Sequence, residues 1–231
     1  GTFLISKMAK KLKIKKFIYT SSVSVYGNNQ EKILNENSKI SPDSIYGVSK
    51  YAGELFVKQN LKGTSCKTFI FRIFNTYGPG ENLENQKKGM ISIFSSYIWK
   101  KRTIIIKGSL KRFRDFVFVE DCTKILSKAL ITKIKNYEII NLSFGDNYSV
   151  KEVIKFIIEA SGRKKYNYKV IKGTLGDSFG FHASGNKLKK IFKQKNYIKL
   201  KKGLKIYFGW IKKIPNNSKL ANFHPFKMRI K

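Results

Sequence analysis

A tyrosine and a lysine four residues apart are the side chains of this sequence best placed to do chemistry. They are Tyr46 and Lys50, in the segment YGVSK at residues 46–50. On a helix, side chains at positions i and i+4 share a face. A lysine ammonium beside a phenol favours the phenolate and lowers a tyrosine pKa from its reference value near ~10, so such a tyrosine can act as a general base. The alternative is a surface tyrosine packed on a lysine stem.

Hydroxyl side chains gather before this pair. Residues 19–27 read YTSSVSVYG, and they overlap the end of an apolar run at residues 16–20 that is typical of a buried strand. Open α/β sheets bind ligands at the carboxyl ends of their strands. Two further polar segments follow downstream, RIFNTYGPG at residues 72–80 and RFRDF at residues 112–116.

The elements that must position these residues alternate between strands and helices. We expect strands at residues 16–20, 68–74, 103–106, 117–119, 137–142 and near 166–171. We expect helices at residues 46–60, 89–100, 121–131, 150–160, 186–193 and 201–213, with Ser149 and Glu152 forming a capping box, and a polar loop at residues 28–45. This alternation predicts an α/β fold with a parallel sheet.

The charge of the chain is strongly positive. The 231 residues carry 48 Lys+Arg against 14 Asp+Glu, a formal net charge of +34, while 42% hydrophobic residues are enough for a packed core. A basic surface suits nucleic acid, but the basic residues are 42 lysines and only 6 arginines. Lysine, asparagine and isoleucine are all abundant and share AT-rich codons, which favours compositional bias and makes a nucleic-acid partner the less favoured interpretation. After Asp177 the chain holds no acidic residue, so a basic tail could still touch an anionic partner.

Several classes of protein are disfavoured. No apolar run approaches the ~18–20 residues that a membrane helix needs. We expect no signal peptide, and two cysteines, Cys66 and Cys122, indicate a reducing compartment and hence a cytoplasmic protein. His182 and His224 lie far apart without a Cys/His cluster, so no metal site is expected.

In their order, the four polar segments resemble those of the extended short-chain dehydrogenase/reductases, in the NAD-dependent epimerase/dehydratase branch that acts on nucleotide sugars. The resemblance extends over nearly the whole chain and weakens after about residue 195. It implies part of a Rossmann-type parallel sheet, without its N-terminal strands, plus a smaller α/β substrate-binding domain. Residues 1–77 and 116–143 would belong to the NAD-binding domain, and residues 78–115 and 144–231 to the nucleotide-sugar domain.

The resemblance also assigns roles. Ser22, Tyr46 and Lys50 match the catalytic residues, and together with Phe74 they would contact NAD, with Lys50 on the nicotinamide ribose. Substrate contacts would come from Asn75, Lys88, Gly89, Ile106, Lys107, Arg114 and Asp177.

Some of these residues could instead have a purely structural role. Arg114 could instead pair with Asp115 or Glu120. Ile106 could be a core residue of an apolar strand, and Lys88 and Gly89 could be the solvated start of a helix.

The hydroxyl segment resembles that of the 4-epimerases. Dehydratases of this branch carry a Glu, often after an Asp, where this chain has Ser24 and Val23. The resemblance therefore implies a redox-neutral reaction on a sugar of the UDP-hexose type. Tyr46 removes the proton of the sugar 4-hydroxyl, hydride moves from C4 to NAD, and hydride returns to the other face of the 4-keto sugar. A related dehydratase or reductase, or a non-catalytic chain that binds anions through its basic surface, are the alternatives.

Two departures from the family stand out. The sequence contains no Gly-x-x-Gly-x-x-Gly turn for the dinucleotide pyrophosphate, and its first eleven residues match the helix before the hydroxyl strand. We expect the sequence to be a fragment, although a separate chain or a decayed gene would also account for it. Thr174 and Ser184 stand where the family commonly has nucleotide-binding Arg and Asp. In the complete protein the helix of Tyr46 would also enter a homodimer.

Overall fold

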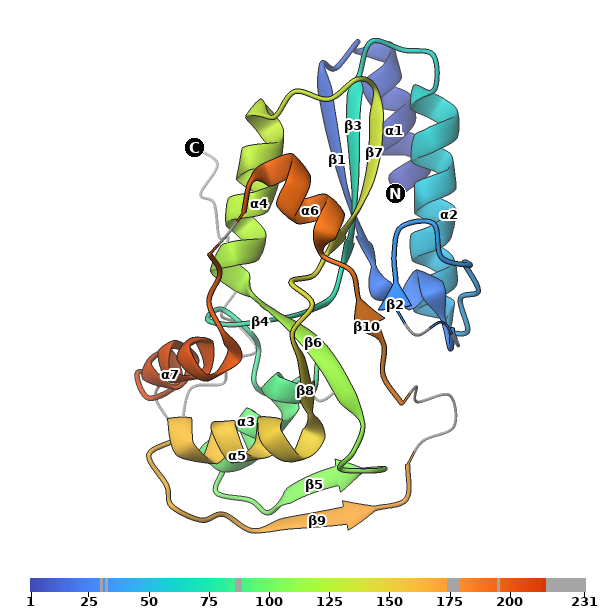
Figure 1. Cartoon of the computed structure of the whole chain (residues 1–231). Helices are drawn as coiled ribbons and strands as arrows, with labels where there is room; N and C mark the ends of the chain where they lie inside the picture. The colour runs from blue at the N-terminus through green and yellow to red at the C-terminus, as the bar shows by residue number, and fades with distance from the viewer. Residues whose placement is uncertain (30, 32, 86–88, 174–178, 195, 215–231) are drawn as a thin grey trace.

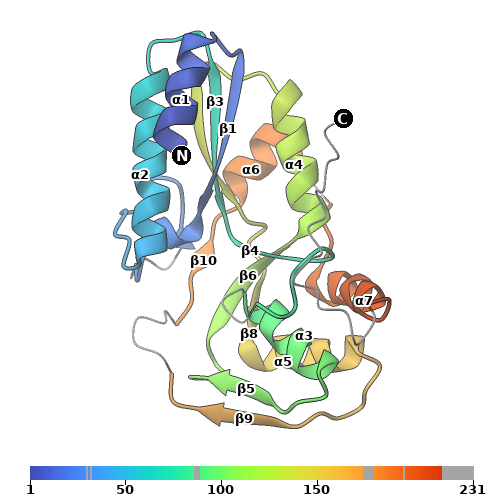
Figure 2. The same cartoon turned by 180° about the vertical axis from the view of Figure 1, so that it is seen from behind.

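The computed structural model describes residues 1–29, 31, 33–85, 89–173, 179–194 and 196–214. Its elements form two groups, drawn above and below in Figure 1. The first group is a parallel sheet of order β1-β3-β7, made of β1 (Lys16–Ser22), β3 (Lys67–Ile73) and β7 (Tyr137–Leu142). Helices α1 (Thr2–Lys11) and α2 (Ile45–Leu61) cover one face of the sheet, and α4 (Val119–Ile131) and α6 (Asn186–Phe192) cover the other (Figures 1 and 2).

The central strand β3 is apolar on both faces because both are covered by helices. Successive side chains of a strand point to opposite faces. Ile70 packs with Val57 of α2, whereas Phe69 and Phe71 pack with Phe192 and the apolar side of α4. The short run of residues 68–74 that predicted a buried strand therefore forms the middle of a three-layer arrangement.

The second group contains the mixed sheet β4-β6-β8, from β4 (Asn75–Tyr77), β6 (Phe113–Phe118) and β8 (Asn147–Ser149), and the parallel pair β5 (Ile104–Lys107) with β9 (Tyr168–Ile171). Helices α3 (Met90–Trp99), α5 (Val150–Ala160) and α7 (Leu200–Ile211) pack around one core with these strands. The expected capping box of Ser149 and Glu152 starts α5.

The two groups are joined by several passages of the chain. β3 runs into β4, β6 runs into α4, and β7 leads to β8 (Figure 1). After the short 3-10 helix η1 (Val23–Tyr26), β2 (Ile33–Leu34) pairs in parallel with β10 (His182–Ala183). The polar segment of residues 72–80 lies at the first of these passages.

The predicted elements are confirmed with a few corrections. The strand expected at residues 117–119 spans Phe113–Phe118, because α4 begins at Val119, and the loop expected at residues 28–45 contains β2. β8 pairs antiparallel with β6, so the second group is not purely parallel. Helix α6, placed by the sequence in the nucleotide-sugar region, contributes Leu188 and Phe192 to the core of the first group. Cys66 and Cys122 are buried as free thiols.

No helix in the described part of the chain has both the length and the apolar character required to cross a membrane.

Candidate active site

The carboxyl end of β1 and the first turns of α2 bring Ser22, Tyr46 and Lys50 together. All three line one cavity of about 320 Å³. The Lys50 Nζ donates a hydrogen bond to the carbonyl of Thr20 at 2.8 Å and lies 5.6 Å from the centre of the Tyr46 ring. The helical spacing of the tyrosine and the lysine therefore does place them on one face, toward the end of the strand.

Local sequence fixes the start of α2 beside η1. Ser44 caps the helix by accepting a hydrogen bond from the amide of Gly47 at 3.1 Å. A Cβ at Gly47 would lie 2.4 Å from the carbonyl oxygen of Ser24, so glycine permits the close approach of helix and loop. Tyr46, on this first turn, remains 54% exposed and presents its ring to the cavity.

Ser22 is buried and its hydroxyl is oriented by its own loop. Its Oγ accepts a hydrogen bond from the amide of Ser24 at 3.2 Å, as the cap of η1, and lies 3.2 Å from the hydroxyl of Ser24. This leaves the hydroxyl at the cavity wall with Tyr46 and Lys50.

Burial affects the lysine of the group. Partial burial lowers the pKa of the Lys50 ammonium, because desolvation disfavours its charged form. Its hydrogen bond to the Thr20 carbonyl holds the ammonium at the end of the strand, beside the tyrosine ring.

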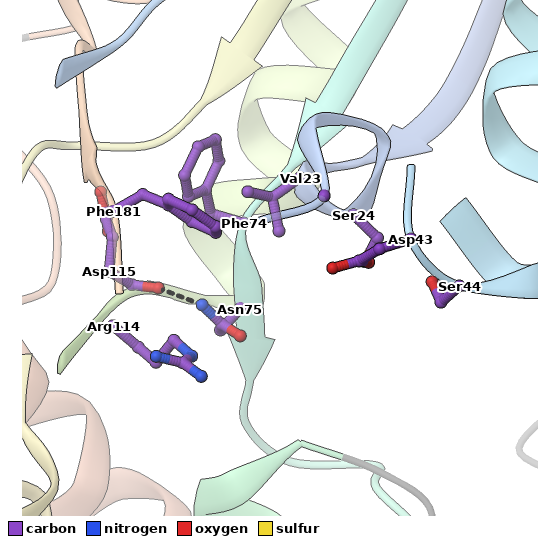
Figure 3. Close-up of a pocket in the computed structure, with 10 residues that line it drawn as sticks. Val23, Ser24, Asp43, Ser44, Phe74, Asn75, Arg114, Asp115 and Phe181 are labelled. Carbon is purple, nitrogen blue, oxygen red and sulfur yellow. Dashed lines mark hydrogen bonds between the residues drawn. The ribbon is translucent and has the colours of Figure 1, made fainter. Parts of the chain in front are cut away.

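A second cavity of about 250 Å³ adjoins the first (Figure 3). The two share the lining residues Val23, Ser24, Phe74 and Asn75. The second cavity adds Gly27, Asp43, Ser44, Arg114, Asp115 and Phe181. Figure 3 shows the hydrogen bond of 2.8 Å from the Asn75 amide to the carbonyl of Asp115, which ties β4 to β6 at this wall.

Arg114 lies at the wall of the second cavity with its guanidinium held by backbone carbonyls. It donates hydrogen bonds to the carbonyls of Phe113 at 2.8 Å and Phe179 at 3.1 Å. Burial, and then the nearby charge of Arg112, lower the pKa of Arg114 to about 10. A guanidinium at the wall of a cavity can donate charge-assisted hydrogen bonds to an anionic ligand.

Asp115 is a buried carboxyl beside the same cavity. Its Oδ2 accepts hydrogen bonds from the Ser143 hydroxyl and, at 2.9 Å, from the amide of Gly145. Burial raises the pKa of Asp115 to about 6, although these hydrogen bonds act in the opposite direction.

We expect Asp115 to make stability fall as the pH rises from about 4 to about 6. In the unfolded chain an aspartate titrates near ~3.9, so the folded state holds the proton over this range while the unfolded state loses it. The free energy of unfolding therefore falls by on the order of 3 kcal/mol across this range. Asp115→Asn removes this titration and flattens that part of the pH profile of the denaturation midpoint.

A control with the opposite sign is Asp146→Asn. Burial alone would raise the pKa of Asp146, but hydrogen bonds from Lys199 and Tyr197 lower it overall. Its carboxylate therefore stabilises the fold above the unfolded pKa, and that contribution is lost as the pH falls. An unchanged profile in Asp115→Asn would contradict the role given to Asp115.

Of the remaining predicted substrate residues, Gly89, Ile106 and Lys107 do not line these cavities. Ile106 is fully buried in the core of the second group, which fits its alternative as a core residue, and Lys107 is exposed at the end of β5. Gly89 is the exposed N-cap of α3. Lys88 and Asp177 lie outside the described residues. A ligand role for these residues stays a prediction.

Sequence reasoning gave no ligand role to Asp43, Ser44, Asp115 or Phe181, which all line the second cavity. Asp43 and Ser44 directly precede the helix of Tyr46, so the helix start itself was the available signal. Phe181 comes from the segment before β10, far away in sequence, and no local pattern marks it.

Comparison with known proteins gives concordant matches. The family model described as NAD dependent epimerase/dehydratase family matches residues 1–143. A putative UDP-glucose 4-epimerase of Methanocaldococcus jannaschii is 36% identical over 158 residues, which cover 68% of this chain and 50% of that protein. The human dTDP-D-glucose 4,6-dehydratase is 31% identical over 159 residues, covering 69% and 44%.

Among solved structures, the UDP-glucuronic acid 4-epimerase of Bacillus cereus, in complex with UDP-glucuronic acid and NAD, superposes with a TM-score of 0.79 at 25% identity. The match covers 92% of this chain and 67% of that one. The chain spans about half the length of the curated relatives that it matches.

Proposed function

The chain belongs to the NAD-dependent epimerase/dehydratase family, and from this premise we propose that it serves the epimerisation at C4 of a nucleotide-activated sugar of the UDP-hexose type, through a 4-keto sugar. The observation that carries the proposal is the meeting of Ser22, Tyr46 and Lys50 at one cavity. Because the chain spans about half of its curated relatives, the activity is proposed for the complete protein.

The proton steps fall to Tyr46 and Ser22. Tyr46 lines the cavity and is half-exposed, so its oxygen is accessible to a sugar hydroxyl. It takes the proton of the 4-hydroxyl while Ser22 donates a hydrogen bond to the same sugar oxygen, and it returns the proton after the sugar has turned over. Lys50 stabilises the negative charge that the Tyr46 oxygen carries before it accepts the proton and again after it returns it.

The residues at this cavity fit the nicotinamide-ribose end of NAD. A lysine ammonium, two hydroxyls and the buried ring of Phe74 line one wall, and they offer hydrogen bonds to a ribose and an apolar contact to a ring. When bound there, NAD would supply the hydride chemistry at the sugar C4. Ser22, Tyr46, Lys50 and Phe74 are the residues of this chain that would hold that end.

A dehydratase is the second candidate, and a specific observation favours it. Ser24 and Val23 stand where dehydratases of the family carry acids, but the carboxyl of Asp43 lines the same cavity as Ser24. Asp43 comes from the loop before α2 and so could supply an acid from another element.

Product analysis distinguishes the two candidates. The complete protein should convert UDP-glucose to its C4 epimer with no net formation of NADH. Accumulation of a keto-deoxy sugar would instead support the dehydratase, and its loss in Asp43→Asn would identify the acid.

Arg114 provides a prediction for substrate binding. We expect Arg114→Ala to weaken the binding of UDP by about tenfold or more, because charge-assisted hydrogen bonds to a diphosphate contribute roughly 1.5–3 kcal/mol each. Isothermal titration calorimetry with UDP measures the change. Arg163→Ala is the matched control, since Arg163 lies against the ring of Tyr166, outside both cavities. Equal UDP affinities for Arg114→Ala and wild type would remove Arg114 from the site.

The outward face of α2 supports a homodimer of the complete protein. Ile45, Val48 and Phe56 are exposed apolar side chains on this helix, with Ile45 at 90% exposure. A second copy packed against them would bury this surface.

A further inference from the structure

A buried ion pair lies behind the catalytic residues and plays no part in the chemistry proposed above. Arg72 donates two hydrogen bonds to Glu54, from Nε to Oε1 at 3.0 Å and from Nη2 to Oε2 at 2.8 Å. Both side chains are 3% exposed. Burial alone would lower the pKa of Arg72, but its hydrogen bonds with Glu54 outweigh this and raise it, so the guanidinium stays charged.

This pair joins α2, β3 and β1, three of the elements that line the first cavity. Glu54 follows Lys50 by four residues on α2, hence one turn further along the same face. Arg72 lies near the end of β3, two residues before Phe74. The third contact is the hydroxyl of Ser21, the residue before Ser22, which donates to Oε1 of Glu54 at 2.6 Å.

The end of β1 also pairs with β3 and accepts a hydrogen bond from the Lys50 Nζ at the Thr20 carbonyl. The helix facing it begins with exposed side chains at Ile45 and Tyr46, and its next turns pack on η1 through Tyr51. The Glu54 carboxylate adds a polar contact between α2, β1 and β3, one helical turn beyond Lys50.

These polar contacts extend to the loop after β1. Arg72 donates from Nη1 to the Tyr26 hydroxyl at 3.0 Å and to the carbonyl of Glu36 at 3.2 Å. The Tyr26 hydroxyl in turn donates to Oδ1 of Asn141 on β7 at 2.7 Å. η1, which orients the Ser22 hydroxyl, is thus fixed through Tyr26 to Arg72 on β3 and to Asn141 on β7.

We propose that Glu54 is a positioning residue that sets the separation of Ser22 from Tyr46 and Lys50 by holding Ser21, Arg72 and α2 to one carboxylate. The inference rests on the proposed function of these three residues. Displacement of a catalytic group by about 1 Å can cost roughly 10²-fold in rate. The Arg114 wall of the second cavity is not held by this carboxylate, so nucleotide binding does not depend on it.

The first test is Glu54→Gln in the complete protein. The amide keeps the shape of the side chain but presents an N–H donor to one of the Arg72 donors, so the two-point grip is lost. We expect kcat to fall by about 10²-fold, with KM for the UDP-sugar and Kd for UDP within twofold of wild type. Hydrogen exchange should become faster at the amides of Ser24 and Gly47, which lie at the two facing loops.

Glu54→Asp distinguishes an effect on the position of the catalytic residues from an effect on the stability of the fold. Aspartate keeps the charge that compensates Arg72 but withdraws it by one methylene from Ser21 and Arg72. We expect a denaturation midpoint close to wild type together with a reduced kcat. Glu138→Gln is the matched control, because Glu138 pairs with Lys187 at a partly exposed site on the other side of the sheet, and its kcat should not change.

The outcomes are distinct for the two proposals. If kcat is unchanged in both Glu54 variants, or if kcat falls only in proportion to the folded fraction, the positioning role is refuted. If the complete wild-type protein does not turn over UDP-sugars, the proposed function is refuted. The positioning role is tested independently of turnover, because unchanged hydrogen exchange at Ser24 and Gly47 in Glu54→Gln would refute it.

Discussion

Replacing Tyr46 by phenylalanine should reduce the turnover of the UDP-sugar by about 10²–10⁴-fold, the range that general acid–base groups contribute. The substitution removes only the oxygen that accepts the proton of the sugar 4-hydroxyl. The ring remains beside Lys50, whose ammonium lies 5.6 Å from its centre, so the cavity keeps its shape. Initial rates of C4 epimerisation by the complete protein measure the effect.

The expected signature is a loss in kcat with little change in KM, since a proton acceptor acts mainly in the transition state. Tyr168→Phe is the control, because Tyr168 lies on β9, in the other group of elements and outside the first cavity. Turnover of Tyr46→Phe within threefold of wild type would show that another group accepts the proton. A dehydratase would show the same loss in Tyr46→Phe, so product analysis remains the test that separates the two candidate reactions.

The parts of the site that lie on one element could be predicted from the sequence. Tyr46 and Lys50 lie on one helix, where spacing alone fixes a common face. The apolar run ending in hydroxyls predicted that Ser22 would stand at a strand end, and that strand is confirmed as Lys16–Ser22. The helix start could be read as well, because Ser44 and Gly47 carry the capping chemistry themselves.

The parts that depend on distant segments could not be predicted from local patterns. Glu54 reads as an ordinary polar residue of a helix, and only its contact with Arg72, 18 residues further along the chain, makes it a buried charge. Phe181 reaches the second cavity because β10 pairs with β2, two strands of two residues each that carry no periodic signal. The apolar pattern around Ile106 was equally compatible with a core residue, and the structure places it in the core.

The second large effect is on stability, and it concerns Arg72. We expect Arg72→Met to lower the free energy of unfolding by about 3–5 kcal/mol, because removing one partner of a buried ion pair leaves the other charge uncompensated. Methionine occupies much of the volume of the arginine stem, so the lost charge and its hydrogen bonds to Glu54 and Tyr26 account for the effect. Urea denaturation followed by circular dichroism gives the free energy.

Two further variants show whether buried charge is the cause. Lys187→Met breaks the partly exposed pair with Glu138, at 35% and 30% exposure, and should cost no more than about 1 kcal/mol. Adding Glu54→Leu to Arg72→Met removes the uncompensated carboxylate and should restore part of the loss, as replacement of whole buried ion pairs often does. If the double variant is less stable than Arg72→Met, the hydrogen bond from Ser21 to Glu54 outweighs the cost of the buried charge. Even where stability returns, kcat should remain low, because the carboxylate that joins α2 to β1 and β3 is gone.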